Sequence, residues 1–257
     1  MGKISDGYIK AIVTAINSLS ASHGGESVYR DWCEMFALSI ANGCDLMRGK
    51  LWQSREERYL QIVGKYKKEA AETFPKMCAE LTLAFESDPY QDHLGTIYMH
   101  LFGGNKNLGQ CFTPIDVCYV CACTAIEPPN EETHYPITVN DCAVGGGAML
   151  IAACKRFKED LKVNYQRDVV FYANDLDSLC VHMCYIQMSL LGARAIIERK
   201  NTITQECFER FITPMEMIRP AFLFGYDESP KEDPQPVSTV QQVVEEPKQL
   251  TLESLIQ

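Results

Sequence analysis

The 257-residue sequence contains no apolar run of the roughly 20 residues that a membrane-spanning helix needs. Its first residues, Met-Gly-Lys-Ile-Ser-Asp, do not form a secretory leader. An excess of positive charge is also missing, because 24 Lys and Arg residues stand against 34 Asp and Glu residues, a formal net charge of −10. These absences exclude a membrane span and argue against a protein that relies on phosphate contacts alone. We expect a cytoplasmic protein without a membrane partner.

The twelve cysteines lack the paired spacing of a zinc site. Cys118, Cys121 and Cys123 cluster in the sequence and His134 follows them, but no second pair completes a ligand set. Most cysteines lie inside apolar helix or strand patterns, where a free thiol packs as a small apolar side chain. Without a leader, reduced thiols in a cytoplasm are favoured over disulfides. We therefore expect no metal site.

Charge is distributed unevenly along the chain. Residues 228–257 contain six acidic and two basic residues, a net charge of −4, so residues 1–227 carry the remaining −6. Residues 48–68 are the one basic stretch, with seven basic and two acidic side chains. This stretch either follows a nucleic-acid backbone or forms the solvated face of helices.

Three regions are predicted from the residue patterns. Residues 1–108 are expected to be helical, because apolar side chains recur there at three- and four-residue spacing. Residues 109–227 alternate strand and helix patterns, which predicts a parallel sheet with right-handed crossovers. Residues 228–257 are an acidic tail without aromatic side chains, expected to be disordered. The predicted helices span 8–19, 28–41, 56–67, 70–86, 93–101, 114–126, 147–157 and 178–191, the predicted strands span 137–142, 168–174, 193–199 and 221–224, and 205–218 is expected to be helical or irregular.

A glycine-rich turn follows the first predicted strand. After Asp141 the chain turns through Gly145, Gly146 and Gly147 into a helix, and the second predicted strand ends in Asp175. In doubly wound α/β folds, such glycines let the backbone approach a nucleotide-like ligand at the carboxyl end of the strand. An acid at the tip of the next strand accepts hydrogen bonds from both ribose hydroxyls. The sequence therefore predicts a nucleoside-binding site.

The order of these motifs resembles that in adenine-N6 DNA methyltransferases, especially the modification subunits of type I restriction systems and their shorter phage or mobile-element versions. Residues 109–114, Gly-Gln-Cys-Phe-Thr-Pro, match the family's Gly-Gln-Phe-[Phe/Tyr]-Thr-Pro element, with Cys111 replacing the first aromatic. Residues 141–147, Asp-Cys-Ala-Val-Gly-Gly-Gly, match its Asp-Pro-Ala-Cys-Gly-Thr-Gly-Gly loop. Further matches are Leu-Gly-Thr-Ile-Tyr-Met at 94–99, Gly-Asn-Lys at 104–106 and the acid Asp175.

The resemblance implies a Rossmann-like class I methyltransferase core, truncated to about four parallel strands, that binds S-adenosylmethionine behind an N-terminal helical region. It implies that residues 109–114 contact the methionine part, that Asp141 accepts from the ammonium group and that Asp175 holds the ribose. The cofactor-binding residues that it implies are Phe112, Thr113, Pro114, Asp141, Ala143, Gly145, Gly147, Asp175, Leu176 and Asn201.

Some of these residues have a second interpretation. Phe112 either packs on the ligand or is an ordinary core aromatic. Thr113 can equally be a helix N-cap, with Pro114 at the first helical position. Asp177, two residues after the ribose acid, is expected to cap the helix that follows it.

Two departures from the family pattern bear on activity. Asn201 stands where family members usually place an Asp that accepts from the adenine amino group, and it can accept there without charge. The family's Asn-Pro-Pro-Tyr motif, which holds the target amine and stacks on the flipped base, is missing from the sequence. At the matching place the chain reads Gly-Tyr-Asp, so Tyr226 and Asp227 are the candidate catalytic residues. Alternatively, these two residues only end a strand.

The expected function is S-adenosylmethionine-dependent methylation of adenine N6 in DNA, with a partner subunit or a second copy assisting. The alternatives are a catalytically degenerate cofactor-binding accessory protein of a phage or mobile element, and a methyltransferase for small molecules or proteins. In the tail, Gln249, Leu250 and Leu252 resemble the short peptide by which bacterial DNA-processing proteins dock on the replication sliding clamp. A short amphipathic helix over 250–256 is the alternative there.

Overall fold

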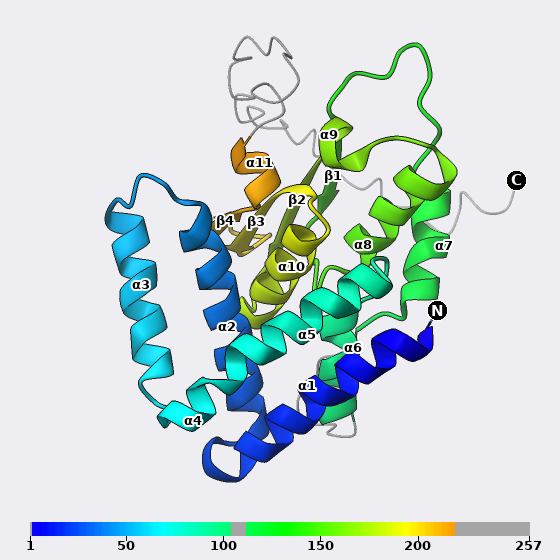
Figure 1. The fold of residues 1–257 in the computed structure, drawn as a ribbon. Helices are drawn as coiled ribbons and strands as arrows, with labels where there is room; N and C mark the ends of the chain where they lie inside the picture. Colours follow the sequence, from blue (N-terminus) through cyan, green and yellow to red (C-terminus); the bar gives the residue numbers. More distant parts are fainter. Residues whose placement is uncertain (1, 104–111, 219–257) are drawn as a thin grey trace, which may run out of the picture.

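The computed structural model describes residues 2–103 and 112–218, which form a layer of helices followed by an α/β unit (Figure 1). The helical layer contains α1 (Gly2–His23), α2 (Gly25–Cys44), α3 (Lys50–Val63), α4 (Lys68–Ala71), α5 (Thr73–Ser87) and α6 (His93–Phe102). The α/β unit contains α7 (Ile115–Ala125), β1 (Ile137–Asp141), α8 (Ala148–Lys155), the π-helical segment η1 (Arg156–Asp160), α9 (Tyr165–Asp168), β2 (Val169–Asp175), α10 (Ser178–Leu190), β3 (Arg194–Lys200), β4 (Cys207–Ile212) and α11 (Pro214–Ile218).

The helices expected in the first hundred residues are present, but some of their ends differ. The helix predicted at 56–67 begins earlier, at Lys50, and ends at Val63. Gly64 follows as its C-cap, with right-handed backbone angles and an N–H that still donates to the carbonyl of Leu60 at 3.0 Å. The apolar periodicity alone did not show this end of the helix.

The described residues contain one sheet with the strand order β1–β2–β3–β4. Strands β1, β2 and β3 are parallel, so that Val139 is paired with Phe171 and Phe171 with Ala195. Helices α8 and α10 connect these strands in the order that the sequence predicts. The expected α/β fold class is therefore confirmed.

The fourth strand differs from the prediction. Residues 205–218 were expected to be helical or irregular, but they contain β4, which pairs antiparallel with β3 and places Phe211 opposite Ile197. The cause is a tight turn at 201–206, in which the side-chain oxygen of Asn201 accepts from the N–H of Ile203 at 3.0 Å. Such a short connection can join only antiparallel strands. The strand expected at 221–224 lies outside the described residues.

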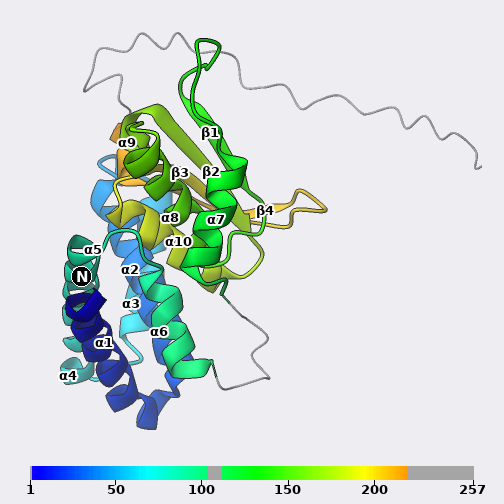
Figure 2. The same cartoon turned by 90° about the vertical axis from the view of Figure 1, so that its right-hand side faces the viewer.

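Helices α1 to α6 lie on one side of the sheet, and α10 packs between the sheet and α2 (Figure 2). The buried core is continuous across this arrangement. Trp32 and Tyr29 of α2, Met183 of α10 and the strand residues Phe171 and Phe211 belong to one apolar cluster. The helical layer and the sheet consequently share a single hydrophobic core.

Within the described residues, no helix combines the length and the apolar character that crossing a membrane requires.

His182 of α10 provides a test of this buried packing. Its ring lies edge-on to Phe211, with centroids 5.6 Å apart, and burial lowers the pKa of His182 to about 4. In the unfolded chain, His182 binds a proton near its ordinary pKa of about 6.5. Packing of the neutral ring therefore stabilises the fold fully above that pH, and this stabilisation is lost as the pH falls toward 4. Between pH 7 and pH 4, we expect the free energy of unfolding of the His182→Leu variant to fall by about 2–3 kcal/mol less than that of the wild type. Urea unfolding at both pH values measures this difference, and equal losses in the two proteins would contradict it.

Candidate functional site

The turn between β1 and α8 contains glycines at positions where a side chain does not fit. Gly145 and Gly147 have φ angles of +54° and +98°, in the left-handed region that favours glycine. A Cβ atom on Gly147 would lie 3.2 Å from the Sγ atom of Cys184 in α10. A Cβ atom on Gly146 would lie 3.1 Å from the Cε atom of Met183. The absent side chains of Gly146 and Gly147 therefore let the turn pack closely on α10, where both glycines are buried and Gly145 is half-buried.

Asp175, at the end of β2, lies directly beside this turn. Its Oδ2 atom accepts from the N–H of Gly145 at 3.0 Å, and its Oδ1 atom accepts from the N–H of Asp177 at 3.0 Å. The two strand ends are joined further by the N–H of Val144, which donates to the carbonyl of Asn174 at 3.1 Å. The structure thus brings together the glycines and the carboxylate that the sequence singled out.

The two residues after Asp175 differ in their surroundings. Leu176, directly after Asp175, is 58% exposed. Asp177 is the N-cap of α10 and accepts from the N–H of Leu179 at 2.9 Å, which confirms the predicted capping role. The Asp177 carboxylate also pairs with the guanidinium of Arg30 at 3.1 Å, and so links α10 to the helical layer.

Asp141 and Ala143 form the first part of the turn. The Oδ1 atom of Asp141 accepts from the N–H of Ala143 at 3.1 Å. The next hydrogen bonds connect the turn to the β3–β4 connection, because the Thr202 hydroxyl donates to the carbonyl of Cys142 at 2.7 Å. Asn174 donates to the same carbonyl at 3.0 Å.

Asn201 was predicted to reach the adenine end of the ligand. Its side-chain oxygen instead accepts from the N–H groups of Ile203 and Thr204, at 3.0 and 3.1 Å. The acceptor is therefore engaged in the β3–β4 turn. The neighbouring Thr202, which sequence reasoning did not select, is the residue of this turn that contacts the β1 end.

Phe112 lies against the glycine turn, 3.7 Å from the position that a Cβ atom on Gly145 would occupy. Its ring also packs edge-on against Tyr98, with centroids 5.2 Å apart, so it contacts both the core and the turn. The alternative that Thr113 caps a helix is wrong, because α7 begins at Ile115 and its N-cap is Pro114, without a side-chain cap hydrogen bond.

A pocket of about 390 Å³ opens beside Phe112. It lies between α6 and the segment that enters α7. Its lining residues are Gln91, Asp92, Gly95, Thr96, Met99, His100, Phe112, Thr113, Pro114 and Ile115.

Two buried polar residues below the turn were not found from the sequence. Gln187 of α10 is fully buried, and its Nε2 group donates to the carbonyl of Gly146 at 2.7 Å and to Oδ1 of Asp92 at 2.8 Å. Asp92 caps α6 by accepting from the N–H of Gly95 at 2.9 Å. Burial raises the pKa of the Asp92 carboxyl above its usual value. The sequence feature that could have indicated this pair is a glutamine inside the apolar pattern of 178–191.

Several candidate residues lie outside the described part of the chain. These are the catalytic candidates Tyr226 and Asp227, the first part of the 109–114 element, and Gln249, Leu250 and Leu252 of the tail. Within the described residues, no three His, Cys, Asp or Glu side chains gather as a metal site would require. Cysteines 118 and 121 illustrate this, because the first is buried in α7 and the second is exposed.

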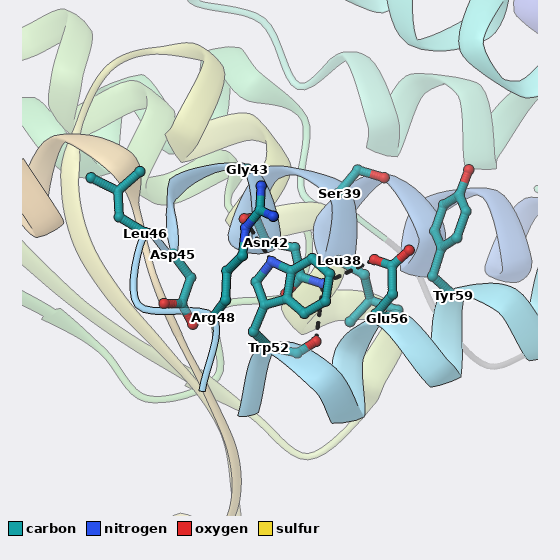
Figure 3. Close-up of a pocket in the computed structure, with 10 residues that line it drawn as sticks. All are labelled: Leu38, Ser39, Asn42, Gly43, Asp45, Leu46, Arg48, Trp52, Glu56 and Tyr59. Atoms are coloured by element: carbon teal, nitrogen blue, oxygen red, sulfur yellow. Dashed lines mark hydrogen bonds between the residues drawn. The ribbon is translucent and has the colours of Figure 1, made fainter. Parts of the chain in front are cut away.

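A larger pocket, of about 640 Å³, lies between α2 and α3 and contains none of the predicted site residues (Figure 3). Trp52 of α3 lines this pocket, and its indole N–H donates to the carbonyl of Asn42 in α2 at 3.2 Å. The Arg48 guanidinium lies 5.4 Å from the Trp52 ring centroid. Two further cations of the basic stretch are paired internally, Lys65 with Asp31 at 2.9 Å and Arg58 with Glu34 at 2.5 Å. These pairs favour the interpretation that residues 48–68 form the solvated face of helices over the interpretation that they follow a nucleic-acid backbone.

Comparisons with known proteins were made against families, curated proteins and solved structures. The model of the N-6 DNA methylase family matches residues 90–242. Among solved structures, the chain is similar to the type I restriction-modification system methyltransferase subunit from Streptococcus thermophilus, with 15% identity and a TM-score of 0.42. That similarity covers 79% of this chain and 60% of the other, so the chain spans less than two thirds of that subunit. No curated protein matches.

The glycine turn yields a prediction about stability. We expect Gly147→Ala to lower the free energy of unfolding by about 1–3 kcal/mol, because alanine is strained at this positive φ and its Cβ atom would press on Cys184. The matched control is Gly7→Ala on the exposed face of α1, where no atom lies within 4 Å of the added Cβ. This control should be neutral or should gain up to about 1 kcal/mol. Denaturant unfolding compares the two variants, and a Gly147→Ala protein as stable as the wild type would refute the prediction.

Proposed function

The chain belongs to the N-6 DNA methylase family, and we propose that it binds S-adenosylmethionine at the turn between β1 and α8. The observation that carries the proposal is the hydrogen bond from the Gly145 N–H to Asp175, 3.0 Å long. It fixes an acid at the tip of β2 next to the three consecutive glycines of the turn. This combination suits an adenosyl group, which needs close backbone contact and a carboxylate for its ribose.

Each part of the site has a role in this proposal. Asp175 holds the ribose hydroxyls, and the exposed Leu176 flanks the adenine ring. Gly145 lets the backbone approach the ligand without a Cβ clash, and Gly147 lets the turn pack closely on Cys184 of α10. Phe112, with Thr113 and Pro114, forms the wall on the side of the methionine part. Asn201 and Ala143 contribute to ligand binding by shaping the β3–β4 turn and the β1–α8 turn, respectively.

We propose that the acceptor is the N6 amine of adenine in DNA. S-adenosylmethionine supplies a methyl group activated by its sulfonium. An exocyclic amine is a weak nucleophile because its lone pair is delocalised into the ring, so the protein must place hydrogen-bond acceptors beside it. Tyr226 and Asp227 remain the candidates for that work and are proposed from the sequence alone.

Cofactor binding is tested by calorimetry on the full chain with S-adenosylmethionine and its demethylated product. Asp175→Ala removes both carboxylate oxygens and should weaken binding by at least about 10- to 100-fold, since even one charge-assisted hydrogen bond contributes about 1.5–3 kcal/mol. Asp6→Ala removes an exposed carboxylate from α1 and serves as the matched control, with unchanged affinity. Wild-type protein that takes up neither ligand would end the proposal.

A second candidate function is a catalytically degenerate accessory protein of a phage or mobile element that binds the cofactor without transferring its methyl group. The observation that favours it is the missing Asn-Pro-Pro-Tyr motif. Incubating the wild type with DNA and methyl-labelled cofactor separates the two functions. Label in DNA adenine supports the enzyme, whereas cofactor binding without label in DNA supports the accessory protein.

We further propose that target recognition comes from a partner subunit or a second copy. Within the described residues, β1 pairs only with β2, so its other edge offers free N–H and C=O groups. A neighbouring strand or chain can pair with such an edge. The proposal that Gln249, Leu250 and Leu252 dock on a sliding clamp depends on the sequence alone.

A further inference from the structure

Two carboxylates flank consecutive residues of the glycine turn. Asp175 accepts from the N–H of Gly145, whereas Oδ1 of Asp92 lies 3.6 Å from the position of a Cβ atom on Gly146. Because neighbouring Cα atoms are about 3.8 Å apart, both acids lie close to the same short piece of backbone. A single elongated ligand on the turn can therefore approach one acid with each end.

Asp92 is placed by three different elements. It caps α6 through Gly95, it accepts from the side chain of Gln187 in α10, and Gln187 in turn donates to Gly146 of the turn. The carboxylate is only 6% exposed, and it lines the 390 Å³ pocket together with Phe112 and Thr113. It is thus held at the wall of a pocket whose lining residues Asp92 and Phe112 also lie beside the glycine turn.

The charge of Asp92 lacks a cationic partner in the described part of the chain. Its hydrogen-bond donors there, the Gly95 N–H and the Gln187 amide, are neutral. Burial lowers the pKa of the neighbouring His93 below its ordinary value, which disfavours its cationic form. A buried carboxylate without a positive partner is costly, and a ligand cation that enters the pocket relieves this cost.

We propose that Asp92 binds the ammonium group at the amino-acid end of S-adenosylmethionine, and that Gln187 and the first turn of α6 hold the carboxylate in place. This inference rests on the proposed function. It moves the ammonium contact away from Asp141, which the family resemblance suggested. Asp141 accepts from the Ala143 N–H and so shapes the turn, but unlike Asp92 it does not line the 390 Å³ pocket.

The test compares two ligands that differ at their amino-acid end. S-adenosylhomocysteine carries the ammonium group, whereas 5′-methylthioadenosine has the same nucleoside and a thioether but no amino acid. Calorimetry measures both with the full-length wild type, Asp92→Asn and the matched control Asp141→Asn. Asparagine caps helices as well as aspartate and keeps an oxygen for Gly95 and Gln187, so the variant removes the charge and retains the fold. Thermal unfolding verifies this.

We expect Asp92→Asn to weaken S-adenosylhomocysteine binding about tenfold or more and to leave methylthioadenosine binding unchanged. In Asp141→Asn, the ratio of the two affinities should stay at the wild-type value. An equal loss of both ligands in Asp92→Asn, no loss, or a selective loss in Asp141→Asn instead would overturn the assignment of Asp92 while the cofactor site stands. If the wild type binds neither ligand, the proposed function fails and this inference fails with it.

Discussion

The amide of Gln187 is the contact on which the geometry of the site depends. One buried side chain supports the carbonyl of Gly146 and a carboxylate oxygen of Asp92, and its own oxygen accepts from the N–H of Leu94 at 3.2 Å. A helix of the α/β unit is thereby connected to the glycine turn and to the start of α6. Because unsatisfied polar groups inside a core are costly, these groups keep their relative positions.

The parts of the fold that could be predicted from the sequence are those set by local chemistry. Apolar spacing located the helices, and β-type runs located β1, β2 and β3. The proximity of Gly145 and Asp175 followed from topology, because the carboxyl ends of neighbouring parallel strands meet at one edge of the sheet. Asp177 was recognised as a cap for the same reason, since its partner, the N–H of Leu179, lies only two residues away.

The features that were missed depend on contacts between distant segments. Asp92 and Gln187 are 95 residues apart in the sequence and meet only because α10 packs beside α6. Strand β4 was missed because its exposed, charged residues do not alternate clearly, and its direction is set by the turn around Asn201. Thr113 has a typical capping side chain, but α7 begins two residues after it.

The shared core has a consequence for detecting ligands. Trp32 and Trp52, the two tryptophans of the sequence, both belong to the helical layer, in α2 and α3. Trp32 nevertheless lies in the same apolar cluster as Met183, which contacts the glycine turn. A molecule bound at the turn stabilises the folded state as a whole by mass action. Intrinsic fluorescence from the helices can therefore report, through a raised melting temperature, on occupancy at the glycine turn.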